Sequence, residues 1–207
     1  MIEPYLIITF LAFNSSNFFP PKISETVDIE SLKSVVEKRE IIFVGKCGKE
    51  NLLATSVGII NASPEEVYSV ITDWNNLPKF LPGLKNAKIV GKPKDNVFFV
   101  EFSISVKFSV FGTSVKYITE EHTEERPARL WSLVVDGPTK GGFRQWELVN
   151  LQDKTLAFFS VCENLKPLPI VGIFFKDNPQ MEIGIPVSST MIILRSIKDR
   201  IERLRKN

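Results

Sequence analysis

The sequence contains few of the side chains on which catalytic and metal sites depend. Its 207 residues include one histidine, His122, and two cysteines, Cys47 and Cys162. A single imidazole excludes His-rich zinc sites and mechanisms that need two histidines, and two cysteines cannot build a disulfide scaffold. A chain of this length buries roughly 70% of the surface that its unfolded form exposes. One domain with a short extension can therefore hold a core without metal or disulfides.

The chain also lacks an excess of charge of either sign. It has 26 Lys and Arg against 24 Asp and Glu, a net charge of +2, and no long basic run. Proteins that bind many phosphates carry a clustered positive surface, so we expect no nucleic-acid partner. No Ser-His-Asp set, glycine-rich phosphate loop or metal-ligand cluster is recognisable, and Gly141-Gly142 is typical of a turn. We therefore expect no cofactor and no metal.

The beginning of the chain has one apolar segment, residues 5–13, which is too short for the roughly 20 residues of a membrane-spanning helix. Its length suits the core of a signal peptide, but Glu3 precedes it where a signal carries Lys or Arg, and the best cleavage position, after Ser16, is poor. Export and a cytoplasmic location both stay open. Cys47 and Cys162 do not decide between them, because free cysteine is common in cores.

Residues 1–50 are expected to form an N-terminal extension, and residues 51–207 the main domain. The extension would hold a signal-like segment (1–16), a proline-containing linker (14–24) and a short helix (29–40). Residues 41–47 and 52–60 then predict a strand pair around Gly48, although one strand with a bulge fits almost as well.

The clearest local signal is Ser63-Pro64-Glu65-Glu66, which predicts a helix start. Ser63 can cap the helix, Pro64 suits its first position, and Glu66 can bond back to the amide of the cap. The apolar residues that follow recur at the spacing of one buried helix face as far as Trp74. Residues 77–83 permit only one further turn, because each proline disfavours helix in the residue before it. Two short helices are therefore expected here.

Residues 87–163 predict an antiparallel meander. Between Phe98 and Phe108 apolar and mostly polar residues alternate, which indicates a strand with one buried face. Turn signals divide the whole stretch into about six strands. Residues 178–206 predict a closing helix that Gly184 and Pro186 should break or kink. The basic end of this helix (195–206) is either a solvated helix terminus or a transient contact with a membrane surface.

Strands, two short helices, a meander and a final helix make an α+β chain. In residues 60–68, 71–74 and 77–83 the sequence resembles the START-like (Bet v 1-like) superfamily, and within it the polyketide cyclase/dehydrase and coenzyme Q-binding proteins. The strand ending near Trp146, Leu168-Pro169 and Arg200-Ile201-Glu202 fit the same pattern. The resemblance covers about residues 52–205 and depends on helix caps and packing positions.

The resemblance implies a helix-grip fold. A curved antiparallel sheet of about six to seven strands would wrap a long C-terminal helix, with two short helices after the first strand. It also implies an apolar cavity between sheet and helix, in which relatives hold lipids, quinones, sterols or polyketides. Fold alone does not assign the ligand.

Side chains that share one face of each strand, or one face of the last helix, are the candidates for lining this cavity. Plain core packing is the alternative for each of them. They are Phe102, Ile104, Val106, Val115, Tyr117, Trp131, Arg144, Trp146, Phe158, Met181, Ile185, Ser189 and Ile192.

Polar candidates are few. Tyr117 and Ser189 could orient a ligand in an apolar pocket. Arg144 either points inward, where it needs a ligand carboxylate or a carbonyl as a partner, or reaches water at a strand end. His122 shares the parity of Lys116 and Glu120, so we expect it on the polar face of the sheet, without a catalytic role.

The sequence thus predicts a non-catalytic protein that binds or carries a hydrophobic small molecule, such as a lipid, a quinone or a polyketide-like compound. The alternative is an enzyme of the polyketide cyclase/dehydrase type, in which Tyr117 and Arg144 would orient the substrate. A third class, an interaction module that uses its basic C-terminal end, stays open.

Overall fold

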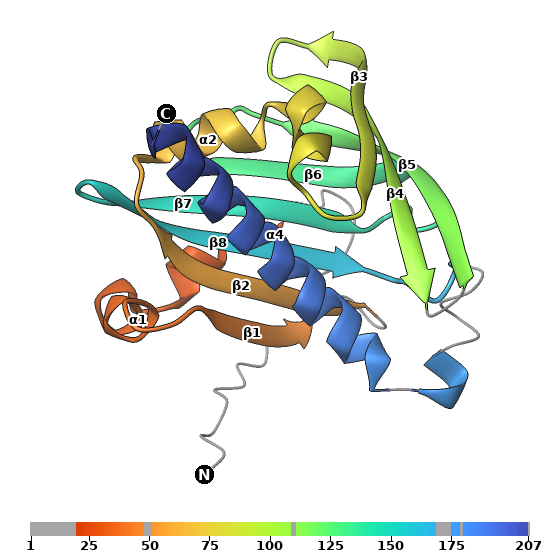
Figure 1. Ribbon diagram of the computed structural model, residues 1–207, viewed down its shortest axis with the longest axis horizontal. Helices are drawn as coiled ribbons and strands as arrows, with labels where there is room; N and C mark the ends of the chain where they lie inside the picture. Colours follow the sequence, from red (N-terminus) through yellow and green to blue (C-terminus); the bar gives the residue numbers. More distant parts are fainter. Residues whose placement is uncertain (1–19, 48–50, 109–110, 169–174, 179, 207) are drawn as a thin grey trace.

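The structure is a computed structural model that describes residues 20–47, 51–108, 111–168, 175–178 and 180–206. Side chains are described throughout these ranges except in residues 106–113. The expected signal-like segment, the turn at Gly48 and the capping role of Pro179 lie outside the described residues. The described part is an α+β fold in which one antiparallel sheet curves around a long helix (Figure 1).

The strands follow one another along the chain as β1 (Ile41–Lys46), β2 (Leu52–Ile60), β3 (Leu84–Lys94), β4 (Val97–Phe108), β5 (Phe111–His122), β6 (Arg129–Asp136), β7 (Phe143–Leu151) and β8 (Lys154–Glu163). The helices are η1 (Ile23–Thr26), α1 (Ile29–Val36), α2 (Pro64–Ile71), η2 (Trp74–Lys79) and α4 (Met181–Lys206).

All eight strands belong to one sheet, in the order β1-β2-β8-β7-β6-β5-β4-β3. Every neighbouring pair is antiparallel, as the hairpin spacing predicts. The predicted strand pair is confirmed, because β1 pairs with β2 from Ile41 opposite Val57 to Lys46 opposite Leu52. The sheet has eight strands, slightly more than the six to seven expected. Part of the N-terminal extension is therefore an edge strand of the main sheet.

The predicted start of α2 is confirmed. The Ser63 hydroxyl accepts a bond from the Glu66 amide at 3.3 Å, and the Glu66 carboxylate accepts one from the Ser63 amide at 2.8 Å. This reciprocal pair satisfies two amides that the first helical turn leaves without partners. The Glu66 carboxylate also accepts a hydrogen bond from Arg205, near the end of α4, with an Nη2–Oε2 distance of 2.9 Å. The start of α2 is thus joined to the C-terminal helix.

Helix α4 runs without interruption from Met181 to Lys206, so Gly184 and Pro186 do not break it. The kink that was the alternative stays a prediction. Pro186 removes one backbone hydrogen bond near the start of the helix, and its buried ring adds apolar packing there. The buried face includes Leu194, Ile197 and Ile201, which pack across the concave face of the sheet with α2 and η2 (Figure 1).

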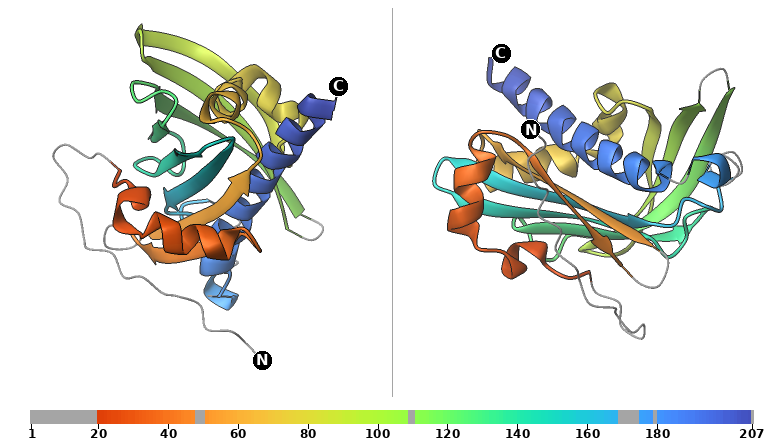
Figure 2. Two further views of the ribbon diagram at one scale, coloured as in Figure 1. Left: turned by 90° about the vertical axis from the view of Figure 1, so that its left-hand side faces the viewer. Right: turned by 90° about the horizontal axis from the view of Figure 1, so that it is seen from below.

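Part of the outer face of the sheet is buried as well, by η1 and α1 (Figure 2). Ile23, Leu32 and Val36 from these two helices form a second core with strand residues such as Phe143 and Phe158. The central strands β7 and β8 are therefore covered on both sides. None of the described helices is long and apolar enough to cross a membrane.

Cys47 and Cys162 form a disulfide that links the end of β1 to β8. The two cysteines are separated by 115 residues in sequence and lie in the outer core. The sequence left open whether these cysteines are free or bonded, and the strand order decides it by bringing the two side by side.

A buried polar network fastens η1 and the residues just before it to the outer face. The carboxylate of Glu147 on β7 accepts bonds from the Ile23 amide at 2.8 Å, the Ser24 amide at 3.0 Å and the Ser24 hydroxyl at 2.6 Å. Burial raises the pKa of Glu147, although the bonds from Ser24 and Ile23 oppose this effect. Arg129 donates to the carbonyl oxygen of Pro20. These contacts make residues 20–26 part of the folded domain.

Candidate functional site

A cavity of about 140 Å³ lies between the concave face of the sheet and the segment that contains α2 and η2. Its walls are mainly apolar. The sheet supplies Phe102, Ile104, Leu130, Trp146 and Phe159. The segment from α2 to the start of β3 supplies Ile71, Trp74, Leu77, Leu81, Pro82 and Leu84, and α4 supplies Ile193.

Aromatic pairs stiffen the sheet side of this cavity. Phe102 and Tyr117, which face each other in the register of β4 and β5, stack with their ring centroids 5.4 Å apart. Trp146 and Phe159, opposite each other on β7 and β8, stack at 4.4 Å. Such pairs contribute about 0.5–1.5 kcal/mol each beyond the burial of their area. They give the sheet side of the cavity a preformed aromatic surface.

Arg144 on β7 carries the positive charge of the cavity wall. Its Nε donates to Oε1 of Glu163 on β8 at 2.6 Å, and its Nη1 donates to the Tyr117 hydroxyl oxygen at 2.5 Å. Burial lowers the pKa of Arg144, but the carboxylate of Glu163 and the Tyr117 oxygen outweigh this effect and raise the pKa above its usual value. Glu163 of this chain supplies the partner that an inward-pointing Arg144 needs, although 22% of the Arg144 side chain is still exposed.

Tyr117 is buried and keeps its proton. Burial raises the pKa of its hydroxyl, and the bond from Arg144 opposes this effect only in part. Because the Tyr117 oxygen accepts the bond from Arg144, its own hydrogen is available to an acceptor in the cavity. Tyr117 can therefore donate to a carbonyl or hydroxyl oxygen of a ligand.

Glu121 is a second acid at this end of the cavity, on the same strand face as Tyr117. It is only 5% exposed and accepts a bond from the Thr119 hydroxyl at 2.6 Å. Burial raises the pKa of Glu121 to about 7, and the bonds from Thr119 and Ser132 and the charge of Arg144 oppose this effect. Near neutral pH it exchanges between a carboxylate and a neutral acid that can donate a hydrogen bond.

Two glycines, Gly137 and Gly142, leave room for the polar residues Tyr117 and Glu163. A Cβ atom at Gly137, whose φ is +108°, would lie 2.7 Å from the Tyr117 Cβ. A Cβ atom at Gly142 would lie 2.8 Å from the Glu163 Cγ. The turn between β6 and β7 therefore packs directly on the strands that carry the cavity residues.

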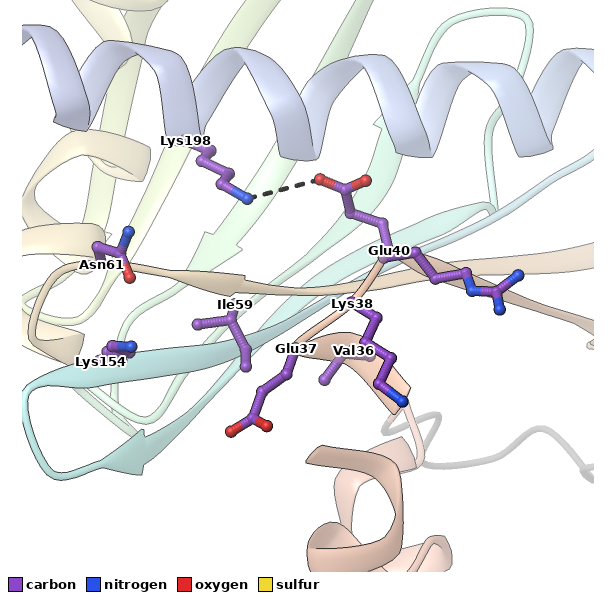
Figure 3. Close-up of a pocket in the computed structure, with 9 residues that line it drawn as sticks. Val36, Glu37, Lys38, Glu40, Ile59, Asn61, Lys154 and Lys198 are labelled. Atoms are coloured by element: carbon purple, nitrogen blue, oxygen red, sulfur yellow. Dashed lines mark ion pairs between the residues drawn. The ribbon is translucent and has the colours of Figure 1, made fainter. Parts of the chain in front are cut away.

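A second pocket, of about 260 Å³, lies between the end of α1, the end of β2 and α4 (Figure 3). Charged side chains dominate its walls, among them Glu37, Lys38, Lys154 and Lys198. Lys198 forms an ion pair with Glu40 there at 3.6 Å. This pocket has neither the apolar walls nor the buried polar groups that favour a small hydrophobic ligand.

Five of the candidate residues lie on the wall of the cavity: Phe102, Ile104, Tyr117, Arg144 and Trp146. Three others, Val115, Met181 and Ile185, belong to or pack against the same inner core without lining the cavity. The side chain of Val106 lies outside the described part. A ligand contact by any of these residues stays a prediction.

Other candidates lie elsewhere. Phe158 belongs to the outer core, and its neighbour Phe159 lines the cavity. Trp131 stacks on His122 with centroids 3.7 Å apart, whereas Leu130 and Ser132 on either side of it line the cavity. Both strands are buried on both faces, so apolar alternation could not identify the inner one.

From Ser189 onward, the expected phase of α4 is also wrong. Ile192 is 47% exposed, and its neighbour Ile193 lines the cavity. Ser189 is only half-buried, whereas Thr190 is fully buried and accepts a bond from the Ser56 hydroxyl at 2.7 Å. The true inner face is thus rotated by about one residue, or about 100°. The stripe of isoleucines and leucines was broad enough to fit both phases.

Sequence reasoning missed Glu121, Glu163 and the cavity wall from α2 and η2. Parity could have found Glu121, because it alternates with His122 and shares the face of Tyr117. Glu163 carries no such signal, because its role depends on the pairing of β8 with β7.

His122 lies on the outer face, as its parity predicts. Its Nε2 is 3.0 Å from Glu120 Oε1, and its Nδ1 is 3.1 Å from Glu124 Oε1. It stacks on Trp131, and the residues on either side of Trp131 line the cavity, so His122 lies on the opposite side of the sheet. Across the described residues, no group of three or more His, Cys, Asp or Glu side chains could hold a metal ion.

The family model described as polyketide cyclase / dehydrase and lipid transport matches residues 60–181. The chain belongs to this family. The match runs from the end of β2 to the first residue of α4, so it includes the sheet side of the cavity and the α2–η2 wall. No curated protein matches the chain in sequence.

Solved structures share the helix-grip fold of this polyketide cyclase / dehydrase and lipid transport family member. A START superfamily protein from Mycobacterium smegmatis has a TM-score of 0.57 at 18% identity, covering 73% of this chain and 98% of its own. The Zhui aromatase/cyclase from a Streptomyces species has a TM-score of 0.55 at 13% identity, covering 73% and 93%. A STAR-related lipid transfer protein from Xanthomonas axonopodis has a TM-score of 0.56 at 13% identity, covering 79% and 93%.

The basic end of α4 is largely engaged in contacts within the chain. Arg195 pairs with Glu40 at 3.1 Å, Lys198 pairs with the same carboxylate, and Arg205 pairs with Glu66. The Arg200 guanidinium lies 5.7 Å from the centre of the Phe80 ring. A membrane contact through this end stays a prediction.

Proposed function

We propose that this protein binds and carries a hydrophobic small molecule in the cavity between the sheet and the α2–η2 segment, without chemical conversion. The observation that supports it best is the composition of the wall. Apolar and aromatic side chains surround one polar end, where Tyr117, Arg144 and Glu121 converge. A few converging polar groups in an apolar pocket are what orients a small ligand.

The polar end supports binding more than chemistry. The charge of Arg144 is already neutralised by Glu163, which reduces its capacity to stabilise a negative charge that develops on a substrate. The histidine lies on the opposite face of the sheet. What remains is a set of hydrogen-bonding groups suited to holding an oxygen atom.

The size of the cavity bears on the ligand. At about 140 Å³ it is smaller than the roughly 300–1,000 Å³ of typical small-molecule sites. A compound with one or two rings fits the cavity best. A long-chain lipid would require the wall formed by η2 and residues 80–84 to move outward.

Native mass spectrometry of the protein after incubation with a lipid-rich extract tests the proposal. We expect a saturable complex in the wild type and in Ile192→Trp, whose added ring lies on the exposed side of α4. The neighbouring variant Ile193→Trp should lose the complex, because its ring fills the cavity. A wild-type protein that is always empty, and takes up neither quinones nor fatty acids, would overturn the proposal.

A second candidate is a cyclase or dehydrase that folds a poly-ketone substrate. It is favoured by the Arg144–Tyr117 hydrogen bond, which places a tyrosine donor and a cation at one end of the cavity. The fold that this chain shares with an aromatase/cyclase supports the same function, but by analogy only. Turnover of a poly-ketone that falls strongly in both Tyr117→Phe and Arg144→Ala would establish this function in place of carriage.

A further inference from the structure

We propose that Glu121 is a specificity-determining residue that makes the cavity reject carboxylate ligands and accept neutral ketones or quinones. The inference rests on the proposed function, since it concerns the ligand of the same cavity. To the proposed function it adds the class of ligand head group that the cavity binds and the residue that selects it.

The charges at the polar end carry the argument. Arg144 and Glu121 are the charged residues of the cavity wall. Two nitrogens of Arg144, Nε and Nη2, lie 2.6 Å from the same Glu163 oxygen, so this pair contributes no net charge. Among the described residues of the wall, Glu121 is the remaining carboxyl group. The polar end is therefore neutral when Glu121 is protonated and negative when it is ionised.

Among the described residues, Arg144 is the cation that acts on Glu121. Thr119 from its own strand donates to it, and Ser132 from β6 supplies a further hydroxyl. Arg144 acts on it only through its electrostatic charge, and Tyr117, whose hydroxyl keeps its proton, shares its strand face. Glu121 also raises the pKa of Tyr68 on α2, a smaller effect than the burial of that tyrosine.

A ligand carboxylate would find no positive partner in this arrangement. It would have to displace Glu163 from Arg144 or lie beside Glu121, and like charges in a buried site repel strongly. A ketone or quinone oxygen needs only donors. The Tyr117 hydroxyl supplies one, and the protonated form of Glu121 supplies a second.

A matched pair of ligands tests this charge selection. Methyl naphthyl ketone and naphthoate have the same ring and nearly the same shape, but only naphthoate is charged. Calorimetric titration at about pH 8 should show the ketone bound about tenfold or more tightly than naphthoate by the wild type. In Glu121→Gln the affinity for naphthoate should rise about tenfold, whereas that for the ketone should change less than about threefold.

Lowering the pH from 8 to 6 should increase the affinity of the wild type for naphthoate, because Glu121 gains a proton over this range. The affinity of Glu121→Gln should not change. Glu120→Gln is the control, since Glu120 is the adjacent acid but pairs with His122 on the outer face. It should behave as the wild type does in both titrations.

The outcomes separate the two proposals. Saturable binding of the ketone, with naphthoate unaffected by Glu121→Gln and by pH, overturns the role of Glu121 and leaves the carrier function standing. Equal affinity of the wild type for the ketone and naphthoate also overturns the role of Glu121 and leaves the carrier function standing. If neither ligand binds and the protein also stays empty in a lipid-rich extract, both proposals are overturned.

Discussion

Arg144 holds Glu163 through two nitrogens, with Nε and Nη2 each 2.6 Å from the same carboxylate oxygen. Glu163 directly follows Cys162 in β8, and Cys162 is bonded to Cys47 at the end of β1. One short stretch of β8 therefore joins the polar end of the cavity to the disulfide that secures the N-terminal extension.

Removing one partner of this pair should be costly. Glu163→Gln leaves the Arg144 charge largely buried without its carboxylate, so we expect a loss of about 2–4 kcal/mol in the free energy of unfolding. Arg195→Ala removes a cation from an exposed pair with Glu40 and should cost no more than about 1 kcal/mol. Urea unfolding measures both. Equal effects of the two substitutions would contradict the buried role of the Arg144–Glu163 pair.

The disulfide should stabilise the fold by about 2–5 kcal/mol, because it closes a long loop in the unfolded chain. Thermal unfolding with and without a reductant measures this contribution. Thiol titration of the unfolded, unreduced protein should find no free thiol. The variant Cys47→Ala/Cys162→Ala should match the reduced protein and be insensitive to the reductant.

Glu121 should make the stability depend on pH. Its pKa of about 7 in the folded protein lies above the unfolded value, so the folded state binds more protons between about pH 4.5 and pH 7. Its contribution to stability is therefore present at low pH and is lost as the pH rises to about 7, by up to about 3 kcal/mol. Glu121→Gln should flatten this part of the curve of unfolding free energy against pH. An unchanged slope would show that Glu121 is not buried as described.

The network around Glu147 should hold residues 20–26 on the sheet. Glu147→Ala removes the acceptor of the Ile23 and Ser24 amides, which then lose their protection. Hydrogen exchange should show at least about tenfold faster exchange at these two amides, with little change in α4. Glu25→Ala, which alters an exposed acid in the same short helix, serves as the control. If the Ile23 amide stays protected from exchange in Glu147→Ala, residues 20–26 are held on the sheet by contacts other than those of Glu147.

Gly137 should be required for the position of Tyr117. Gly137 and Gly141 both have positive φ, of +108° and +87°, but only a Cβ atom at Gly137 would contact Tyr117. Gly141→Ala should cost about 1 kcal/mol from backbone strain alone, and Gly137→Ala should cost at least about 1 kcal/mol more. Urea unfolding compares the two variants. Equal losses would mean that the contact with Tyr117 carries no energy.

Local patterns were sufficient for most of the fold. The capping box at Ser63 and Glu66 marked α2, and strict alternation from Phe98 to Ile104 identified β4 and its inner face. These predictions succeeded because caps depend on residues three apart, and alternation identifies a face wherever only one face is buried. The same alternation failed at Trp131 and Phe158, where η1 and α1 or neighbouring side chains bury the outer face as well.

The sequence by itself determined the element order, the α+β class and the family, all of which depend on caps, turns and spacing between near neighbours. Only the tertiary structure decided that Cys47 and Cys162 are bonded, that Arg144 has Glu163 as its partner, and that Glu121 faces the cavity. The physical reason is that each of these contacts depends on which strands lie side by side and on what covers the far face of the sheet. The scarcity of histidine excluded some chemistry, but the charges of the cavity became visible only when β5, β7 and β8 were placed together.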